Sequence, residues 1–350
     1  MSYFDSVKNT PIKENAIIMG IETSCDETAV AIIKGGREIL ADEIISSATE
    51  HARFGGVVPE IASRAHTIAI QTATENALKN SGLTLNDIDA FAVTEGSGLL
   101  GALLVGVSYA KSLAFATGKP LVPVSHIRGH IAASYLADKT LKPPFVTILA
   151  SGGHTAIIAV NDYYDFKVFG STIDDAVGEA FDKVARVLKL NYPGGPNLEK
   201  LAKQGKNIIP LPKMLKNYQG SEFDFSYSGL KTAVINYVHN QTERGVEINP
   251  ADVACSFQCS AVDVLVEKAL KVIDITGYKT LTLSGGVSAN GYLRETLANA
   301  VKDKDIKLVL PEKRYCTDNA CMIGAEGYLQ YLRSNFADLD LNAKAVIPLR

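Results

Sequence analysis

The stretch IIMGIETSCDETAVAIIKGGREILADEIIS, residues 17–46, indicates how the N-terminal half folds. It contains three short apolar runs, at residues 17–22, 28–33 and 38–46. Gly35 and Gly36 separate the second run from the third, and paired glycines are typical of the tight turn in a β-hairpin. The stretch therefore predicts a meander of three strands.

Alternating helices and strands follow this meander. Helices are predicted at residues 59–80, 99–117 and 126–136, with strands at 88–94 and 121–124 between them. The N-terminal half is thus predicted to run through three strands and then through helix, strand, helix, strand and helix.

The second half repeats this order of elements. A second meander is predicted from strands at residues 145–150, 155–160 and 166–169. After it come helices at 174–188, 227–239 and 251–276, a strand at 280–283, a helix from Ala289, a strand at 307–309 and a last helix from Thr317. The repeated order predicts two α/β domains that face one another across a cleft.

The expected domain boundaries follow from this order. The first domain spans residues 16–140 and is completed by the last helix, 317–333. The second spans residues 141–316 and contains an insertion at about 170–226, of which 191–226 is rich in Pro, Gly and Lys. Linkers are expected near residues 139–144 and 310–315.

The composition is that of an ordinary globular protein, with 47% hydrophobic and 21% charged residues among 350. The formal net charge of −3 gives no strong field for polyanions, so contact with a nucleic acid is expected to be local. Five cysteines without a C-x-x-C pair suit a reducing compartment.

Two segments bear on targeting. The first fifteen residues lack the apolar region of a signal peptide, and we interpret them as a frayed extension. The apolar run 99–117 is interrupted by polar side chains, and we interpret it as a buried core helix rather than a membrane span. We therefore expect a cytoplasmic protein that does not enter a membrane.

Three turns rich in glycine and small polar residues lie at the ends of predicted strands. They are GIETSCDET at residues 20–28, ASGGHT at 150–155 and SGGVSAN at 284–290. Ligands of α/β sheets bind beyond strand ends, and glycines let backbone amides approach a phosphate closely. A tight turn explains one Gly-Gly pair, but three matching turns favour a nucleotide-like ligand. The chain has no G-x-x-x-x-G-K-[ST] stretch, so a P-loop is excluded.

Asp182 is a candidate contact for such a ligand. It lies on the predicted helix 174–188, away from the apolar stripe of that helix. Charges in such positions usually form a solvated face. If the helix borders the cleft, the Asp182 carboxylate can instead accept hydrogen bonds from the hydroxyls of a ligand.

The stretch SHIRGH, residues 125–130, places two histidines four positions apart. Such residues are neighbours on a helix, so His126 and His130 could bind one cation, although capping and packing explain the spacing equally well. The H-E-x-x-H motif of metallopeptidases has a glutamate after its first histidine, where this chain has Ile127. The pair can therefore hold a metal but lacks the base that activates water.

The candidate third ligand is Asp318, in RYCTDNA at the start of the last predicted helix. The helix dipole alone also favours an acidic residue there. Two imidazoles and one carboxylate with open coordination positions suit iron(II), and zinc is compatible. We therefore expect one divalent metal ion, iron(II) in preference to zinc.

Ten motifs, in this order and spacing, closely resemble the tRNA N6-adenosine threonylcarbamoyltransferase family, in its bacterial branch. They are GIETSCDET, FGGVVPEIASRAH, GALLVGVSYAKSLA, SHIRGH, ASGGHT, DDAVGEAFDKVA, YPGGP, FSYSGLKT, SGGVSAN and CTDNA. The resemblance covers roughly residues 17–332. It implies an actin-like ATPase (ASKHA) fold, in which two duplicated RNase H-like α/β domains surround a central cleft.

The resemblance also implies the residues of the site. The metal ligands of the family fall on His126, His130 and Asp318. Its substrate contacts fall on Leu149, Ala150, Ser151, Gly152, Gly153, Asp182, Gly195 and Asn290. No residue is singled out as a general acid or base.

The implied reaction moves the threonylcarbamoyl group from threonylcarbamoyl-AMP to N6 of adenosine 37, beside the anticodon, in tRNAs that read codons beginning with A. Because AMP is a good leaving group, this acyl transfer depends on proximity rather than on strong acid catalysis. The implied partners are tRNA, a non-catalytic paralogue and a small ATPase, and the predicted helices 59–80 and 99–117 are the expected surface for a partner. The rival interpretations are a metallopeptidase and an ATPase or sugar kinase of the same fold.

Two positions depart from the usual pattern of the family. Ser97 replaces a common Pro and is expected to loosen a turn, and Arg128 replaces a common Glu. The Arg128 cation could repel a metal or bind RNA phosphates. Lysines of the insertion form a candidate patch for tRNA phosphates, for which a solvated loop is the alternative. They are Lys200, Lys203, Lys206, Lys213 and Lys216.

Overall fold

The computed structural model describes residues 2–215 and 218–348, which form two compact units. Unit 1 contains the chain up to Leu141 together with the segment that begins at Asp318. Unit 2 contains Lys142–Thr317. Lys216, one of the five lysines of the candidate patch, lies outside the described residues.

Unit 1 is built on a five-stranded sheet in the order β3-β2-β1-β4-β5. Its strands are β1 (Ile17–Glu22), β2 (Glu27–Lys34), β3 (Glu38–Ser46), β4 (Ala90–Gly96) and β5 (Leu121–Ser125). The first three pair antiparallel, whereas β1, β4 and β5 pair parallel. Gly35 and Gly36 join β2 to β3 with φ of 58° and 69°, the left-handed region that glycine enters without strain. The predicted meander is confirmed.

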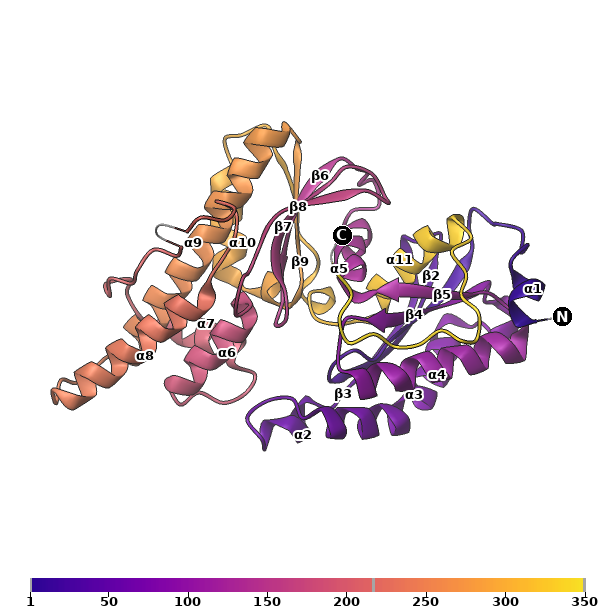
Figure 1. Cartoon of the computed structure of the whole chain (residues 1–350), viewed down its shortest axis with the longest axis horizontal. Coiled ribbons are helices and arrows are strands. Elements are labelled where there is room, and N and C mark those ends of the chain that lie inside the picture. The colour runs from indigo at the N-terminus through magenta and orange to yellow at the C-terminus, as the bar shows by residue number, and fades with distance from the viewer. Residues whose placement is uncertain (1, 216–217, 349–350) are drawn as a thin grey trace. The chain divides into compact units, whose positions relative to one another are not determined.

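Helices cover both faces of this sheet (Figure 1). Those that cover the sheet are α3 (Pro59–Ser81), α4 (Leu100–Thr117), α5 (His126–Ala137) and α11 (Ala320–Leu332). The unit also contains α1 (Tyr3–Val7), α2 (Ala48–Ala52) and a short 3-10 helix at Leu85–Asp87. Met19 and Phe91 pack toward α3 and α4, while Ile18 and Ala92 pack toward α5 and α11. Successive strand residues thus fill two hydrophobic layers, because side chains alternate between the faces of a sheet.

Unit 2 repeats the topology of unit 1. Its strands are β6 (Phe145–Ala150), β7 (Thr155–Val160), β8 (Phe166–Ser171), β9 (Thr280–Ser284) and β10 (Lys307–Val309), in the order β10-β9-β6-β7-β8. Its helices are α6 (Val177–Val187), α7 (Gly194–Ala202), α8 (Tyr227–Glu243), α9 (Pro250–Thr276) and α10 (Gly291–Val301), with 3-10 helices at Gly286–Ala289 and Lys313–Tyr315. A meander followed by two parallel strands therefore occurs twice, as the sequence predicts.

The N-terminal segment differs from the expected frayed extension. Residues Tyr3–Val7 form α1, whose Val7 is fully buried. The hydroxyl of Tyr3 donates a hydrogen bond to the carbonyl of Lys119, at 2.5 Å. The interpretation as a frayed extension is wrong, because these contacts and the ion pair of Lys13 with Asp89 dock the segment on the domain.

Helix α4 also differs from its expected burial. Among the described residues, α4 is the one helix that is long and apolar enough to cross a membrane. This judgement rests on length and composition alone, and the core helix of a soluble protein passes the same test. A third of α4 is buried, including Leu103 and Val107, whereas Leu104 and Phe115 are exposed. The helix is therefore buried along one face only and is not a fully buried core helix.

Helix α6 begins three residues later than predicted. Asp174 and Asp175 lie before its first residue and bind other groups. Asp174 accepts a hydrogen bond from the backbone of Ser228, and Asp175 forms ion pairs with Lys183 and Lys231. These contacts to α6 and α8 hold the two aspartates in a turn.

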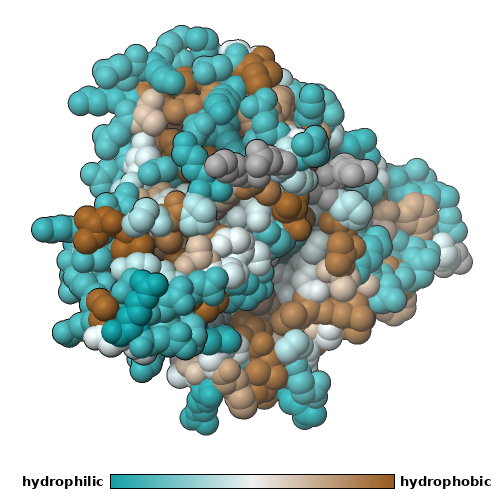
Figure 2. Space-filling view, turned by 60° about the vertical axis from the view of Figure 1, so that its left-hand side comes forward, coloured by the Kyte–Doolittle hydropathy of each residue, from teal (hydrophilic) through white to brown (hydrophobic). Residues whose placement is uncertain are grey.

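Over the face drawn in Figure 2, hydrophilic side chains predominate and hydrophobic ones are interspersed among them.

Candidate metal centre and ligand-binding turns

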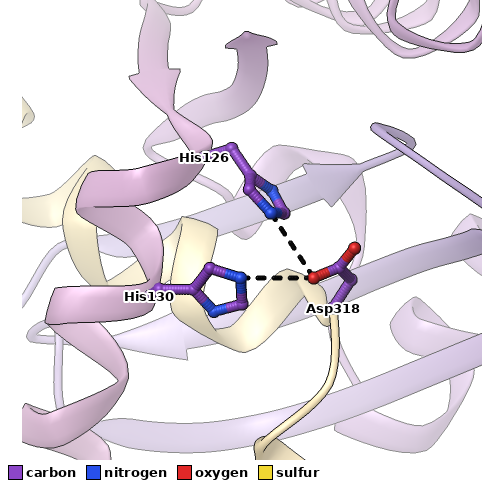
Figure 3. A group of neighbouring side chains, drawn as sticks. All are labelled: His126, His130 and Asp318. Carbon is purple, nitrogen blue, oxygen red and sulfur yellow. Dashed lines mark ion pairs between the residues drawn. The ribbon is translucent and has the colours of Figure 1, made fainter. Parts of the chain in front are cut away.

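Three side chains of unit 1 converge as the sequence predicts. His126 and His130 lie on the first turns of α5, which begins directly after β5, and Asp318 lies two residues before α11. Oδ1 of Asp318 is 3.4 Å from Nε2 of His126 and 3.3 Å from Nε2 of His130 (Figure 3). The three potential ligand atoms lie within 4.8 Å of one another, and no other group of this kind occurs among the described residues.

The surroundings of these side chains fit a metal ion. His126 is 7% exposed and His130 is 1% exposed. Nε2 of His130 is buried, and the carboxylate of Asp318 at 3.3 Å is the polar group that faces it. Two imidazole nitrogens and a carboxylate oxygen are donors that iron(II) and zinc accept. The group is therefore a possible metal site.

A buried carboxylate that the sequence analysis did not single out supports His126. Glu22, the last residue of β1, is fully buried, and its Oε2 lies 3.0 Å from Nδ1 of His126. Thr94 donates a hydrogen bond to the same oxygen at 2.7 Å, and the backbone N–H of Ser24 donates to Oε1 at 2.5 Å. The sequence did contain a signal for this role, since Glu22 is an acidic residue at the end of an otherwise apolar strand. A charged side chain is buried at such a position only when it has polar partners.

The two histidines differ in charge because they differ in neighbours. Burial disfavours the charged form of His126, but the negative charges of Asp318 and Glu22 outweigh burial and raise the pKa of His126 to about 9. Burial lowers the pKa of His130 below its usual value. At neutral pH and without a metal, His126 is therefore the charged member of the pair.

Arg128 pairs with a carboxylate rather than standing free beside the metal ligands. Its Nε donates a hydrogen bond to Oε1 of Glu326 on α11 at 2.7 Å, and Gln330 donates to the same oxygen at 2.6 Å. Glu326 is 3% exposed. The cation of Arg128 is therefore compensated within the fold, and the pair connects the helix of the two histidines to the helix that follows Asp318.

Ser97 connects the turn after β4 to the end of the described chain. Its hydroxyl accepts a hydrogen bond from the backbone N–H of Ile347 at 2.8 Å and donates to the carbonyl of Ile347 at 3.3 Å. Nearby, Lys344 forms an ion pair with Glu95 at 2.8 Å. The expectation that Ser97 loosens this turn relative to a Pro stays a prediction, and its hydroxyl fastens a second segment to the turn.

The glycine-rich turns of unit 2 lie next to one another. Gly285 has a φ of 87°, and a Cβ atom there would stand 2.5 Å from the carbonyl oxygen of Ala150. The turn that contains Gly152 and Gly153 follows β6, and space is open where their Cβ atoms would stand, as it is at Gly286. Backbone amides beside open space suit a ligand that binds through phosphate oxygens.

Asp182 and Gly195 are in direct contact, whereas Asn290 has partners of its own. Oδ1 of Asp182 accepts a hydrogen bond from the backbone N–H of Gly195 at 3.1 Å, at the start of α7. Asn290 caps α10 by accepting from the N–H of Leu293, and it donates to Gln258 at 2.9 Å. Both polar side chains therefore shape the backbone of unit 2, a role that their motifs did not reveal.

Comparison with solved structures identifies the class of fold. The chain is similar to HypF of T. kodakarensis, with a TM-score of 0.63 and 15% identity over 95% of this chain and 49% of that one. It is also similar to component A of the Acidaminococcus fermentans (R)-2-hydroxyglutaryl-CoA dehydratase, with a TM-score of 0.52 and 15% identity over 91% and 99% of the two chains. The chain is thus a two-domain protein of the actin-like ATPase fold that carries a possible metal site.

Comparison of sequences gives the family. The model of the tRNA N6-adenosine threonylcarbamoyltransferase family matches residues 38–325. The relative of that name in Clostridium botulinum strain Kyoto is 50% identical over 333 residues, 95% of this chain and 97% of the relative. The one in Staphylococcus aureus strain RF122 is 48% identical over 96% of this chain and 98% of the relative. The chain belongs to the tRNA N6-adenosine threonylcarbamoyltransferase family.

Proposed function

We propose that the chain transfers the threonylcarbamoyl group from threonylcarbamoyl-AMP to N6 of adenosine 37 in tRNAs that read codons beginning with A. The observation that carries this proposal is 50% identity to a relative of that name over nearly the full length of both chains. In the reaction, the N6 amine forms a bond to the carbamoyl carbon, the bond from that carbon to the phosphate oxygen breaks, and AMP leaves with the electron pair. The amine loses one proton to solvent.

We propose that His126, His130 and Asp318 hold one divalent ion through two Nε2 atoms and one carboxylate oxygen. Iron(II) is the favoured ion and zinc the alternative, because this donor set suits both. Such an ion, when bound, supplies Lewis-acid polarisation of a substrate carbonyl. The burial of both imidazoles and the approaches of their Nε2 atoms to Oδ1 of Asp318, at 3.3 Å and 3.4 Å, support this assignment.

Unit 2 is proposed to hold the nucleotide part of the substrate. The backbone of Leu149, Ala150, Ser151, Gly152 and Gly153 would contact it, and open space beside the two glycines supports contact with phosphate. Asp182, Gly195 and Asn290 would contact the ribose and base. The hydrogen bond from Gly195 to Oδ1 of Asp182 supports the proposal that these two residues contact the ligand together.

The proposed partners are tRNA, a non-catalytic paralogue and a small ATPase, in the cytoplasm. Helices α3 and α4 are proposed to face a protein partner, and the exposed apolar side chains of Ile68 and Phe115, 80% and 67% exposed, support this. For tRNA, Lys203 is a weaker candidate than the other described lysines of the insertion, because it pairs with Glu199 at 2.9 Å.

Isotope-labelled threonine tests the proposed reaction. The chain is incubated with tRNA, the two partner proteins and an adenylate-forming enzyme that supplies threonylcarbamoyl-AMP. We expect the label in threonylcarbamoyladenosine after digestion of the tRNA. Cleavage of a protein substrate that stops on chelation would instead indicate a metallopeptidase, and steady ATP turnover by the isolated chain would indicate an ATPase. Neither alternative is favoured by the relatives of the chain.

A further inference from the structure

We infer that Glu22 is a positioning residue for the metal site: it keeps a proton on Nδ1 of His126 so that Nε2 is free to bind the ion. The inference rests on the proposed metal site and goes beyond the three ligands. Glu22 contacts Nδ1 of His126 while Nε2 faces Asp318, so it acts on the proposed site through His126.

Both carboxylate oxygens of Glu22 are surrounded by groups that donate hydrogen bonds. The side chain is fully buried, and Oε1 accepts from the backbone N–H of Ser24. Oε2 accepts from the hydroxyl of Thr94 and lies 3.0 Å from Nδ1 of His126. Both oxygens already accept hydrogen bonds from other groups, so we assign the hydrogen of the contact to His126 to Nδ1.

That proton decides which nitrogen of His126 can bind a metal. A neutral imidazole carries one hydrogen, and with the hydrogen on Nδ1 the lone pair lies on Nε2. Nε2 of His126 points to Oδ1 of Asp318, as does Nε2 of His130 (Figure 3). A carboxylate behind a metal-binding histidine also makes the imidazole a stronger donor.

Thr94 and Ser24 make the arrangement rigid. Oε2 is shared between Thr94 on β4 and His126 on α5, and Oε1 is held by the turn that follows β1. The hydroxyl of Ser24 lies 3.1 Å from the same Nδ1. Four segments of unit 1 therefore fix the direction of one imidazole ring before any ligand arrives.

The substitution Glu22→Gln tests the inference without changing the size of the side chain. If the amide oxygen accepts from Ser24, the amide NH2 faces Thr94 and His126. Nδ1 must then accept a hydrogen bond, which moves the proton of the neutral ring to Nε2 and blocks metal binding. We expect zinc affinity, measured by competition with a chelator, to fall about 10- to 100-fold, the effect typical of such supporting carboxylates.

Glu50→Gln is the matched control, because it makes the same change at an exposed glutamate of unit 1 that lies outside the hydrogen bonds of Glu22. We expect its zinc affinity to stay within about threefold of the wild type, well short of the loss typical of a removed supporting carboxylate. Equal zinc affinity of Glu22→Gln and the wild type would overturn the inference and leave the proposed function standing. A wild-type protein that binds neither zinc nor iron(II) would overturn the metal site itself.

A measurement on the unmodified protein keeps the inference testable if Glu22→Gln does not fold. In the zinc-loaded wild type, nitrogen NMR of labelled histidine should show His126 protonated at Nδ1 and metal-bound at Nε2. The opposite assignment, with zinc on Nδ1, would overturn the inference. Transfer to tRNA, measured separately, reports on the proposed function and not on the tautomer.

Discussion

The proposed metal site of unit 1 and the glycine-rich turns of unit 2 are built in opposite ways. The metal site uses side chains whose far sides are held by buried partners, as Glu22 holds His126. The turns use the backbone, and open space stands where side chains of Gly152 and Gly286 would be. The first site should therefore be sensitive to the loss of a side chain, and the second to the gain of one.

Removal of a ligand should have the largest effect. Asp318→Ala deletes the carboxylate that both histidines approach, so zinc affinity should fall more than about 100-fold, beyond the loss typical of a supporting residue. Formation of threonylcarbamoyladenosine should fall with it. Metal content after dialysis and mass spectrometry of tRNA nucleosides measure the two effects. Asp303→Ala, an exposed aspartate of unit 2, is the control and should change neither.

Loss of Arg128 should affect stability more than metal binding. Arg128→Ala leaves the Glu326 carboxylate buried without its cation, so the free energy of unfolding should fall by about 3 kcal/mol. The exposed ion pair of Arg64 and Glu60 is the control, and Arg64→Ala should cost less than about 1 kcal/mol. Denaturant unfolding measures both. If Arg128→Ala weakened zinc binding as much as Glu22→Gln, Arg128 would belong to the metal site.

Adjacent glycines of one turn should respond differently to alanine. Gly285→Ala forces a side chain into a backbone with φ of 87° and against the carbonyl of Ala150, which should cost about 2 kcal/mol. Gly286→Ala meets open space, and its unfolding free energy should change by less than about 0.5 kcal/mol. Binding of an AMP derivative should then weaken in Gly286→Ala at wild-type stability. Unchanged binding there would remove Gly286 from the proposed nucleotide contacts.

Metal binding should depend on pH through His126. Its pKa of about 9 means that the metal-free ring is protonated at pH 7, so an ion must displace one proton. Affinity should rise up to about tenfold for each pH unit, about 1.4 kcal/mol, and level off above pH 9.

The raised pKa of His126 also stabilises the metal-free fold. This contribution is fully present below the unfolded pKa of 6.5 and is lost as pH rises through 9. Calorimetric titration of the protein with zinc in two buffers of different ionisation enthalpy counts the protons released when the ion binds. Release of no proton at pH 7 would contradict the prediction that metal binding displaces the proton of His126.

The smallest effect is expected at Ser97. Ser97→Ala removes both hydrogen bonds to Ile347 and should cost about 1 kcal/mol. Ser112→Ala removes a hydroxyl bonded only within α4, and its effect should stay below about 0.5 kcal/mol. Hydrogen exchange at Gly98, whose N–H bonds the carbonyl of Ala345, should rise in Ser97→Ala alone. Unchanged exchange at Gly98 would mean that Ser97 does not hold this segment.

Features that depend on neighbours in sequence could be predicted, and most features that depend on distant partners could not. Asp318 is the exception, because its CTDNA motif singled it out before its distance from the two histidines was known. Gly35 and Gly36 predicted the β2–β3 hairpin, and the four-residue spacing of His126 and His130 predicted their convergence. By contrast, Glu22 meets His126 across 104 residues, and Arg128 meets Glu326 across 198. No local pattern of sequence encodes such a pairing. Each of these side chains could pair with many other residues, and only the assembled sheet and helices decide which one it meets.

The most direct test of the account is the yield of threonylcarbamoyladenosine for each metal ion bound. Protein stripped with a chelator is reloaded stepwise with iron(II) or zinc and supplied with tRNA, threonylcarbamoyl-AMP and its partners. The account predicts that the yield rises in proportion to the bound ion and that Asp318→Ala stays at the level of the blank. Wild-type yield from the stripped protein, or from Asp318→Ala, would contradict it.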